Sequence, residues 1–161
     1  MKVMKTDDTE NYLVLVADDS EDDRLLMKQA LRRAKRLELA GEVTNGREAI
    51  AYLSGHADFG DREKFPLPDL LLLDLKMPHK DGFEVLQWLQ SESLDNMTVV
   101  VLTDSMRAEH IKKALDLGAD LFQVKPTQNF EREAMILALE ERLIQTMRAP
   151  LKKLQSVQLA M

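Results

Sequence analysis

Four short apolar runs in this sequence each lead into a residue whose side chain can bind phosphate or a divalent cation. Asp18 and Asp19 follow the first run, Asp74 ends the second, Thr103 ends the third, and Lys125 follows the fourth. If the runs are parallel strands of one sheet, these side chains gather at its carboxyl edge, where open α/β sheets bind ligands. Carboxylates are preferred ligands of Mg²⁺, and an ionised aspartate can accept a phosphoryl group. The pattern therefore predicts a magnesium site at which a carboxylate is phosphorylated.

The segments that would position these residues alternate between strand-like and helix-like patterns. Such alternation is typical of βαβ units in a parallel sheet that is covered on both faces. We expect strands at 12–17, 39–44, 69–74, 97–103 and 121–125. We expect helices at 21–36, 47–53, 106–117 and 129–147, and one more helix after Gly82.

The first predicted helix has a clear start signal and an apolar face. Ser20 is a favourable N-cap residue, and Asp23, three residues later, gives a capping-box arrangement. Helical spacing predicts a buried face that consists of Leu25, Leu26, Ala30, Leu31 and Ala34. We therefore expect this helix to cover one face of the sheet.

The composition favours one domain and disfavours several classes of partner. A chain of 161 residues suits a single domain, which we place at 12–147 between a polar tail at 1–11 and a tail at 148–161. The net charge of -6, with both signs interspersed, disfavours a DNA-binding surface. No run approaches the ~20 apolar residues of a membrane span, and the polar N-terminus lacks the apolar core of a secretory signal. With no cysteine in the chain, we expect a cytoplasmic location.

Taken together and in this order, the motifs resemble the receiver domain of bacterial two-component response regulators. The resemblance covers residues 12–147 and rests on four segments: Val14 to Asp19, Leu73 to Pro78 with Asp81-Gly82, Leu102-Thr103, and Val124 to Pro126. It implies a flavodoxin-like α/β fold with five parallel strands in the order 2-1-3-4-5 and helices on both faces. No single segment is specific, but the combination is.

The resemblance implies a role for each polar residue at the strand ends. Asp74 is the expected phosphoacceptor, and Mg²⁺ is the expected cofactor. The expected ligands of the metal are Asp18, Asp19, Asp74 and the backbone carbonyl of Lys76. Thr103 and Lys125 are expected to bind the phosphoryl oxygens, on which charge develops during transfer. Read singly, each acid could also be an ordinary residue at a strand end or a helix start.

The resemblance also implies how phosphorylation is read out. Thr103 and Phe122 are the expected switch pair, in which movement of the threonine makes room for the aromatic ring. Plain core packing is the other reading of Phe122. The Lys125–Pro126 bond is expected to be cis, which would help to aim the ammonium into the site. Asp104 stands where the family usually has a small residue, and its charge would lie near the phosphoryl entrance.

These features predict a single-domain response regulator that takes a phosphoryl group from a sensor histidine kinase and signals through protein contacts. Such a protein catalyses its own phosphorylation and dephosphorylation and is not a conventional enzyme. One alternative is a constitutive docking module whose acid pocket is never phosphorylated. A second is a phosphatase with an aspartyl nucleophile, which would want an Asp-x-Asp arrangement after the first strand and a cap domain.

Two further segments bear on partners. The connection 54–68 is long for a compact domain and favours the small regulators that pair with phytochrome histidine kinases, although filler is a competing reading. In the last helix, one apolar stripe contains Phe130, Ala134, Leu137 and Ile144, and another contains Met135, Leu139 and Leu143. We expect the second stripe to be partly exposed and to form a homodimer through the face from the fourth helix to the final helix. Packing by the tail after residue 148 is the other reading.

Overall fold

The computed structural model describes residues 10–94, 96–104 and 107–148. Its strands are β1 (Tyr12–Ala17), β2 (Leu37–Val43), β3 (Leu70–Asp74), β4 (Thr98–Thr103) and β5 (Leu121–Val124). Its helices are α1 (Glu21–Leu31), α2 (Gly46–Ser54), α3 (Gly82–Gln90), α4 (Ala108–Asp116) and α5 (Asn129–Arg148), with a short 3₁₀ turn at Ala57–Phe59. Met106, where the fourth helix was expected to begin, and both predicted tails except residues 10, 11 and 148 lie outside the described residues.

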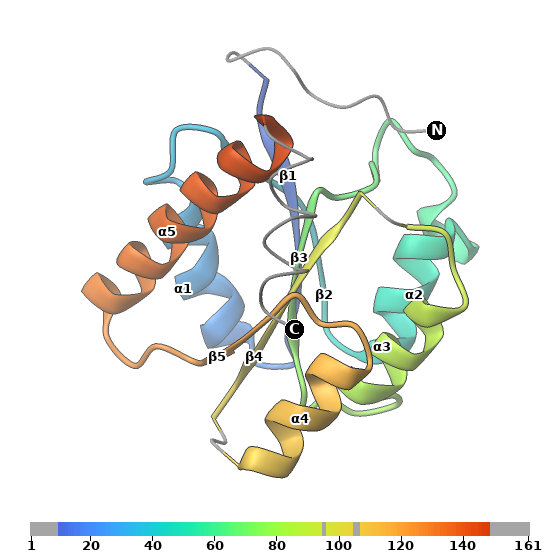
Figure 1. The fold of residues 1–161 in the computed structure, drawn as a ribbon. Helices are drawn as coiled ribbons and strands as arrows, with labels where there is room; N and C mark the ends of the chain where they lie inside the picture. The colour runs from blue at the N-terminus through green and yellow to red at the C-terminus, as the bar shows by residue number, and fades with distance from the viewer. Residues whose placement is uncertain (1–9, 95, 105–106, 149–161) are drawn as a thin grey trace.

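All the strands pair in parallel, in the order β2-β1-β3-β4-β5. Helices α1 and α5 cover one face of this sheet, and α2, α3 and α4 cover the other (Figure 1). The expected flavodoxin-like α/β fold is therefore confirmed. Among the described residues, no helix is long and apolar enough to cross a membrane.

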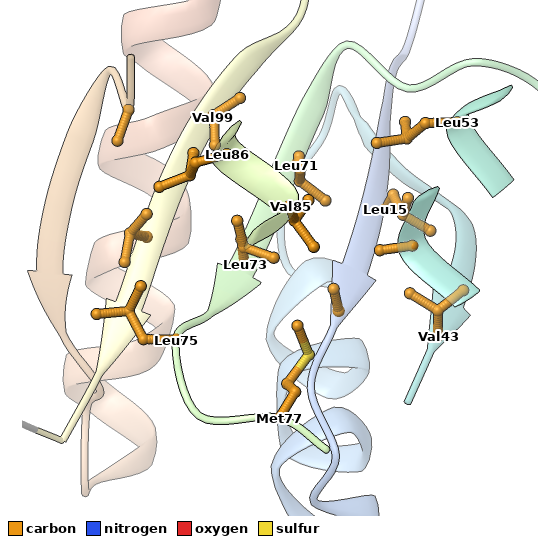
Figure 2. Packing of buried hydrophobic residues seen from close by; sticks show 14 of the residues in the cluster. Leu15, Val43, Leu53, Leu71, Leu73, Leu75, Met77, Val85, Leu86 and Val99 are labelled. Atoms are coloured by element: carbon orange, nitrogen blue, oxygen red, sulfur yellow. The ribbon is translucent and has the colours of Figure 1, made fainter. Parts of the chain in front are cut away.

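The central strand divides its side chains between two cores. Leu71 and Leu73 point to the side of α2 and α3, where they pack with Leu15, Val85 and other apolar residues (Figure 2). Leu70 and Leu72, which alternate with them, belong to the second core under α1 and α5. All of β3 is buried, as expected for a strand covered on both faces. Burial of each leucine stabilises the fold by roughly 1.5–3 kcal/mol. The position of Asp74 at the end of β3 is therefore well fixed.

Two aspartates at the opposite edge fix the alignment of neighbouring strands. The Asp69 carboxylate accepts a hydrogen bond from the Leu13 N–H at 2.7 Å, and the Asp69 N–H donates to the Leu13 carbonyl at 2.7 Å. Asp120 repeats this arrangement with Val99, at 2.8 Å and 2.9 Å. Because the strands start in register, their carboxyl ends also arrive at one edge.

The first helix is shorter than its sequence pattern predicted. It ends at Leu31 instead of residue 36, and β2 begins earlier than expected, at Leu37. The chain is drawn into the sheet here because the Arg36 carbonyl accepts a hydrogen bond from Tyr12 at 2.6 Å. The Arg36 N–H in turn donates to the Glu140 carboxylate at 2.6 Å, which ties this turn to α5.

The predicted apolar face of α1 is right for Ala30 and Leu31 but wrong for Leu25, and the faces predicted for α5 are exchanged. Leu25 is 50% exposed, because the buried face of α1 is formed by Met27, Ala30 and Leu31. In α5, the stripe that was expected to be exposed lies in the core: Met135, Leu139 and Leu143. Phe130 and Leu137 from the other stripe are the exposed residues, at 67% and 46%. Both errors concern which side of an apolar helix meets the sheet, and periodicity alone does not decide that.

The long connection 54–68 is folded back onto α2. The Arg62 guanidinium donates hydrogen bonds to the carbonyls of Tyr52 and Phe65 at 2.8 Å and 3.1 Å, and to that of Leu53 at 2.9 Å. The rings of Tyr52, Phe59 and Phe65 pack together, with centroids 5.1–5.9 Å apart. Arg62 thus caps the carbonyls at the end of α2, together with the Gly55 N–H, which donates to the Tyr52 carbonyl at 3.2 Å.

We expect Arg62→Ala to lower the free energy of unfolding by roughly 1–3 kcal/mol, because the freed carbonyls lose their charged donor. Urea denaturation followed by circular dichroism measures this change. Glu63→Ala, at the exposed neighbouring position, is the matched control and should stay within about 0.5 kcal/mol of the parent. Equal stability of the two variants would contradict a structural role for Arg62.

Candidate functional site

The predicted site residues meet at the carboxyl edge of the sheet. Asp74 ends β3 opposite Leu102, and Thr103 ends β4 opposite Val124. Asp18 and Asp19 follow β1 directly, and Lys125 follows β5. Residues that are up to 107 positions apart in the sequence, as Asp18 and Lys125 are, are therefore brought into direct contact.

Three carboxylates form the acidic part of the site. Asp18, Asp19 and Asp74 each offer an oxygen, and these oxygens all lie within 4.8 Å of one another. Asp18 and Asp74 are buried, whereas Asp19 is exposed. An all-oxygen donor set of this spacing fits a hard divalent cation such as Mg²⁺ or Mn²⁺. The structure thus brings these three side chains together, and their role as metal ligands stays a prediction.

Backbone donors orient the two buried carboxylates. Asp18 Oδ1 accepts a hydrogen bond from the Ser20 N–H at 2.9 Å, and Asp74 Oδ1 accepts one from the Lys76 N–H at 3.2 Å. The Arg24 guanidinium also donates to the Asp18 backbone carbonyl at 2.9 Å, which ties the start of α1 to the end of β1. Each carboxylate therefore keeps its Oδ2 atom turned toward the site.

The Lys125 ammonium binds those Oδ2 atoms. Its Nζ lies 2.8 Å from Asp18 and 3.1 Å from Asp74. Burial alone would lower the pKa of Lys125, but the hydrogen bonds to Asp18 and Asp23 and the nearby charge of Asp74 raise it above its ordinary value. Lys125 is consequently a permanent cation, able to stabilise negative charge that develops at the site.

Asp74 is the carboxyl group whose ionisation is most perturbed at this edge. Burial raises its pKa to about 6, the charge of Lys125 opposes the rise, and the charge of Asp18 adds to it. A carboxylate that is desolvated but still ionised at neutral pH is suited to nucleophilic attack.

Asp23 contributes to the site, although the sequence pattern gave it only a role at the helix start. Its Oδ2 lies 3.0 Å from Lys125 Nζ, and its side chain is 42% exposed. The capping interaction is present as well, with the Asp23 N–H donating to Ser20 Oγ at 3.1 Å. No spacing rule connects residues 23 and 125, so only the fold reveals this contact.

Thr103 and Phe122 lie on the neighbouring strands β4 and β5, as expected, but their side chains do not share the same surroundings. Thr103 is buried at the end of β4, where it lines an open groove with Asp19, Lys76 and His110 among its walls. Its carbonyl accepts a hydrogen bond from the Lys125 N–H at 2.9 Å. Phe122 is partly buried and packs against the core on the side of α3 and α4. Core packing thus accounts for Phe122 here, and its switch role stays a prediction.

The predicted cis bond before Pro126 is wrong. Among the described residues there is no cis peptide bond, so the Lys125–Pro126 bond is trans. Trans is the more stable form of an X-Pro bond by about 0.5–1 kcal/mol. A cis bond is not needed, because the ammonium already reaches Asp18 and Asp74. Arg132 holds the turn in this form by donating to the Pro126 carbonyl at 3.0 Å.

Two glycines fit the loop from β3 to α3 tightly against its neighbours. A side chain at Gly82 would place a Cβ 2.8 Å from the Leu75 Cα and 2.5 Å from the Asp74 carbonyl oxygen. A side chain at Gly46 would collide with the backbone of Lys80, whose carbonyl accepts the Gly46 N–H at 2.9 Å. The loop that carries Lys76 is thus held by Gly82 near its start, at Leu75, and by Gly46 near its end, at Lys80. The Lys76 carbonyl as a metal ligand stays a prediction.

The sequence has recognisable relatives. Residues 14–138 match the model of the response regulator receiver domain family. A protein-glutamate methylesterase/protein-glutamine glutaminase of Halalkalibacterium halodurans is 35% identical over 114 residues, which cover 71% of this chain and 30% of that protein. The chain thus spans about a third of that relative. Response regulator Rcp1 of Synechocystis is 28% identical over 139 residues, which cover 86% of this chain and 92% of Rcp1.

Solved structures agree with these matches. The phosphorylated cyanobacterial phytochrome response regulator RcpA superimposes with a TM-score of 0.75 at 30% identity, over 84% of this chain and 96% of RcpA. The Mn²⁺-bound form of Rcp1 superimposes with a TM-score of 0.70 at 29% identity, over 80% of this chain and 91% of that protein.

The raised pKa of Asp74 predicts a pH dependence of stability. Since the folded protein binds this proton more tightly than the unfolded chain does, ionisation of Asp74 costs stability, and the cost grows as the pH rises from about 4 to about 6. With chelator present, Asp74→Asn should therefore gain stability relative to the parent across this window. Urea denaturation at several pH values measures the difference.

Asp58→Asn, which alters an exposed acid in the connection 54–68, is the control and should follow the parent. If the stabilities of the parent and of Asp74→Asn changed with pH in parallel, the raised pKa of Asp74 would be refuted.

Proposed function

We propose that this chain, which belongs to the response regulator receiver family, accepts a phosphoryl group on Asp74 from a sensor histidine kinase and signals through protein contacts. The observation that carries the proposal is the contact of the buried Asp74 carboxylate with the Lys125 ammonium, beside two further acids at the ligand-binding edge of the sheet. An ordinary ion pair would not need the additional carboxylates of Asp18 and Asp19.

The residues of the site divide the work of transfer among them. An oxygen of Asp74 forms the new bond to phosphorus while the bond from phosphorus to the donor nitrogen of the kinase histidine breaks. Lys125 and the Thr103 hydroxyl then neutralise and hydrogen-bond the phosphoryl oxygens. Asp18, Asp19, Asp74 and the Lys76 carbonyl would hold Mg²⁺, which supplies positive charge against the acids and the phosphoryl group.

The likeness to RcpA and Rcp1 supports a phytochrome-type kinase as the phosphoryl donor. The methylesterase activity of the first relative is not transferred, because only 30% of that protein is matched. We assign to this chain no chemistry beyond its own phosphorylation and dephosphorylation. The docking-module and phosphatase alternatives are less favoured, since residues 14–138 match the receiver family and Asp18-Asp19-Ser20 lacks the Asp-x-Asp arrangement of such a phosphatase.

Phosphotransfer tests this proposal directly. Purified protein mixed with a phosphorylated phytochrome-type histidine kinase and Mg²⁺ should gain one phosphoryl group on Asp74, found by mass spectrometry after borohydride trapping. Asp74→Asn should lose this acceptance because its amide is not a nucleophile. Asp116→Asn, an exposed aspartate at the far end of α4, should behave like the parent. Normal stoichiometry in Asp74→Asn would refute the assignment.

We also propose homodimer formation through an apolar surface of α4, β5 and α5. This surface comprises the exposed residues Leu115, Val124, Phe130 and Leu137. β5 is an edge strand, and α4 and α5 flank it from opposite faces of the sheet (Figure 1). Four of the five large apolar residues that are exposed in the described part of the chain lie on these three elements, and exposed apolar groups of this kind often mark an interaction site.

We expect phosphorylation to strengthen the dimer and Leu137→Glu to abolish it, because the carboxylate would have to be buried without a partner. Sedimentation velocity of unmodified and phosphorylated protein measures both effects. Leu25→Glu, which changes a similarly exposed leucine on α1, should leave association unchanged. A monomer in both states, over the accessible concentration range, would exclude this dimer.

A further inference from the structure

Lys125 has one more carboxylate partner than the metal site can explain. Its ammonium contacts Asp18 at 2.8 Å, Asp23 at 3.0 Å and Asp74 at 3.1 Å. We propose that Asp23 is a positioning residue, which holds Lys125 at the site while a divalent cation occupies Asp18 and Asp74. The inference rests on the proposed function in one respect, since it takes those acids to be the ligands of the cation.

The contacts divide into two kinds. An ammonium has three N–H donors, and the carboxylates of Asp18, Asp23 and Asp74 each lie within hydrogen-bonding distance of it. Asp18 and Asp74 also belong to the acid cluster whose oxygens lie within 4.8 Å of one another. Asp23 lies outside that cluster. It is therefore the partner of Lys125 that does not also serve the cation.

The cation and Lys125 compete for the same oxygens. Ser20 and Lys76 already donate backbone hydrogen bonds to the Oδ1 atoms of Asp18 and Asp74. Lys125 binds their Oδ2 atoms. A divalent cation that draws on these carboxylates weakens the contacts of Lys125 and repels its positive charge. Without another anchor, the ammonium would leave the edge at which the phosphoryl group arrives.

Asp23 is well placed to be that anchor. It lies in the first turn of α1, and its N–H is held by Ser20 Oγ at 3.1 Å. The next residue, Arg24, binds the Asp18 carbonyl at 2.9 Å and Glu42 at 3.2 Å, so the start of the helix is fixed to the site. The Asp23 side chain is 42% exposed, which leaves room for its carboxylate to move with the ammonium.

Replacement of Asp23 should therefore weaken cation binding more than the simple loss of one negative charge near the site would. When the cation displaces Lys125 in Asp23→Asn, the ammonium has no remaining carboxylate to turn to. A double-mutant cycle with Lys125→Met isolates this effect, because residues of one ion-pair network are not additive.

Titration with Mn²⁺, followed by electron paramagnetic resonance of the free ion, gives the affinity without any phosphotransfer. We expect binding to weaken about three- to tenfold in Asp23→Asn. The matched control is Asp22→Asn, which removes the same charge from the neighbouring exposed residue and should change affinity less than about twofold. Lys125→Met should bind Mn²⁺ more tightly than the parent, and in its background Asp23→Asn and Asp22→Asn should have equal effects. Asp23→Glu, which keeps the carboxylate, should restore most of the affinity.

The outcomes separate the positioning role from the metal site. If the parent binds Mn²⁺ and Asp19→Ala weakens it, but Asp23→Asn equals Asp22→Asn, the positioning role is overturned and the metal site stands. The positioning role is likewise overturned if the excess effect of Asp23→Asn persists in Lys125→Met. If the parent binds no Mn²⁺, or Asp19→Ala leaves binding unchanged, the metal site fails and the inference fails with it.

Discussion

The contact between Lys125 and the acids at the end of β1 and β3 is the interaction on which the site depends. Asp18 and Asp74 are both buried, and two carboxylates that close would repel each other strongly without a cation between them. A buried ion pair of this kind is poor evidence of stability, because desolvation offsets much of the attraction. Burial indeed raises the pKa of Asp74 to about 6 despite the lysine. The arrangement is better understood as a binding site, in which the ammonium would attract an anion and the carboxylates would attract a cation.

The sheet supplies the precision that this arrangement requires. The buried leucines of β3 fix the height of Asp74, and the paired hydrogen bonds of Asp69 and Asp120 at the far edge align the strands beside it. Gly82 adds a second constraint, since only the absence of a side chain lets α3 begin against the Asp74 carbonyl. The site is therefore rigid on the side of β3, while its exposed acid, Asp19, lies toward solvent.

Sequence reasoning succeeded where the chemistry is local and failed where it depends on packing. Strand ends are readable because apolar runs stop at polar residues, so Asp18, Asp74 and Thr103 were placed correctly. Leu25 of α1 and the inner face of α5 were not, because α5 is apolar on more than one side and packing against the sheet decides which side is buried. The contact of Asp23 with Lys125 spans 102 positions, and the local sequence around neither residue predicts it. The cis bond was expected by family likeness alone, and the trans chain reaches the same acids.

The topology also brings the site close to the apolar surface of α4, β5 and α5. Val124, which belongs to that surface, directly precedes Lys125, and the Lys125 N–H is bound to the Thr103 carbonyl at 2.9 Å. β5 has a neighbour on one side only, so fewer hydrogen bonds hold it than hold β3. A change of partner at the Lys125 ammonium therefore occurs one residue from the apolar surface and on the least constrained side of the site. Since interfaces respond to small shifts in a bistable way, this adjacency provides a short physical route from charge at Asp74 to protein contacts.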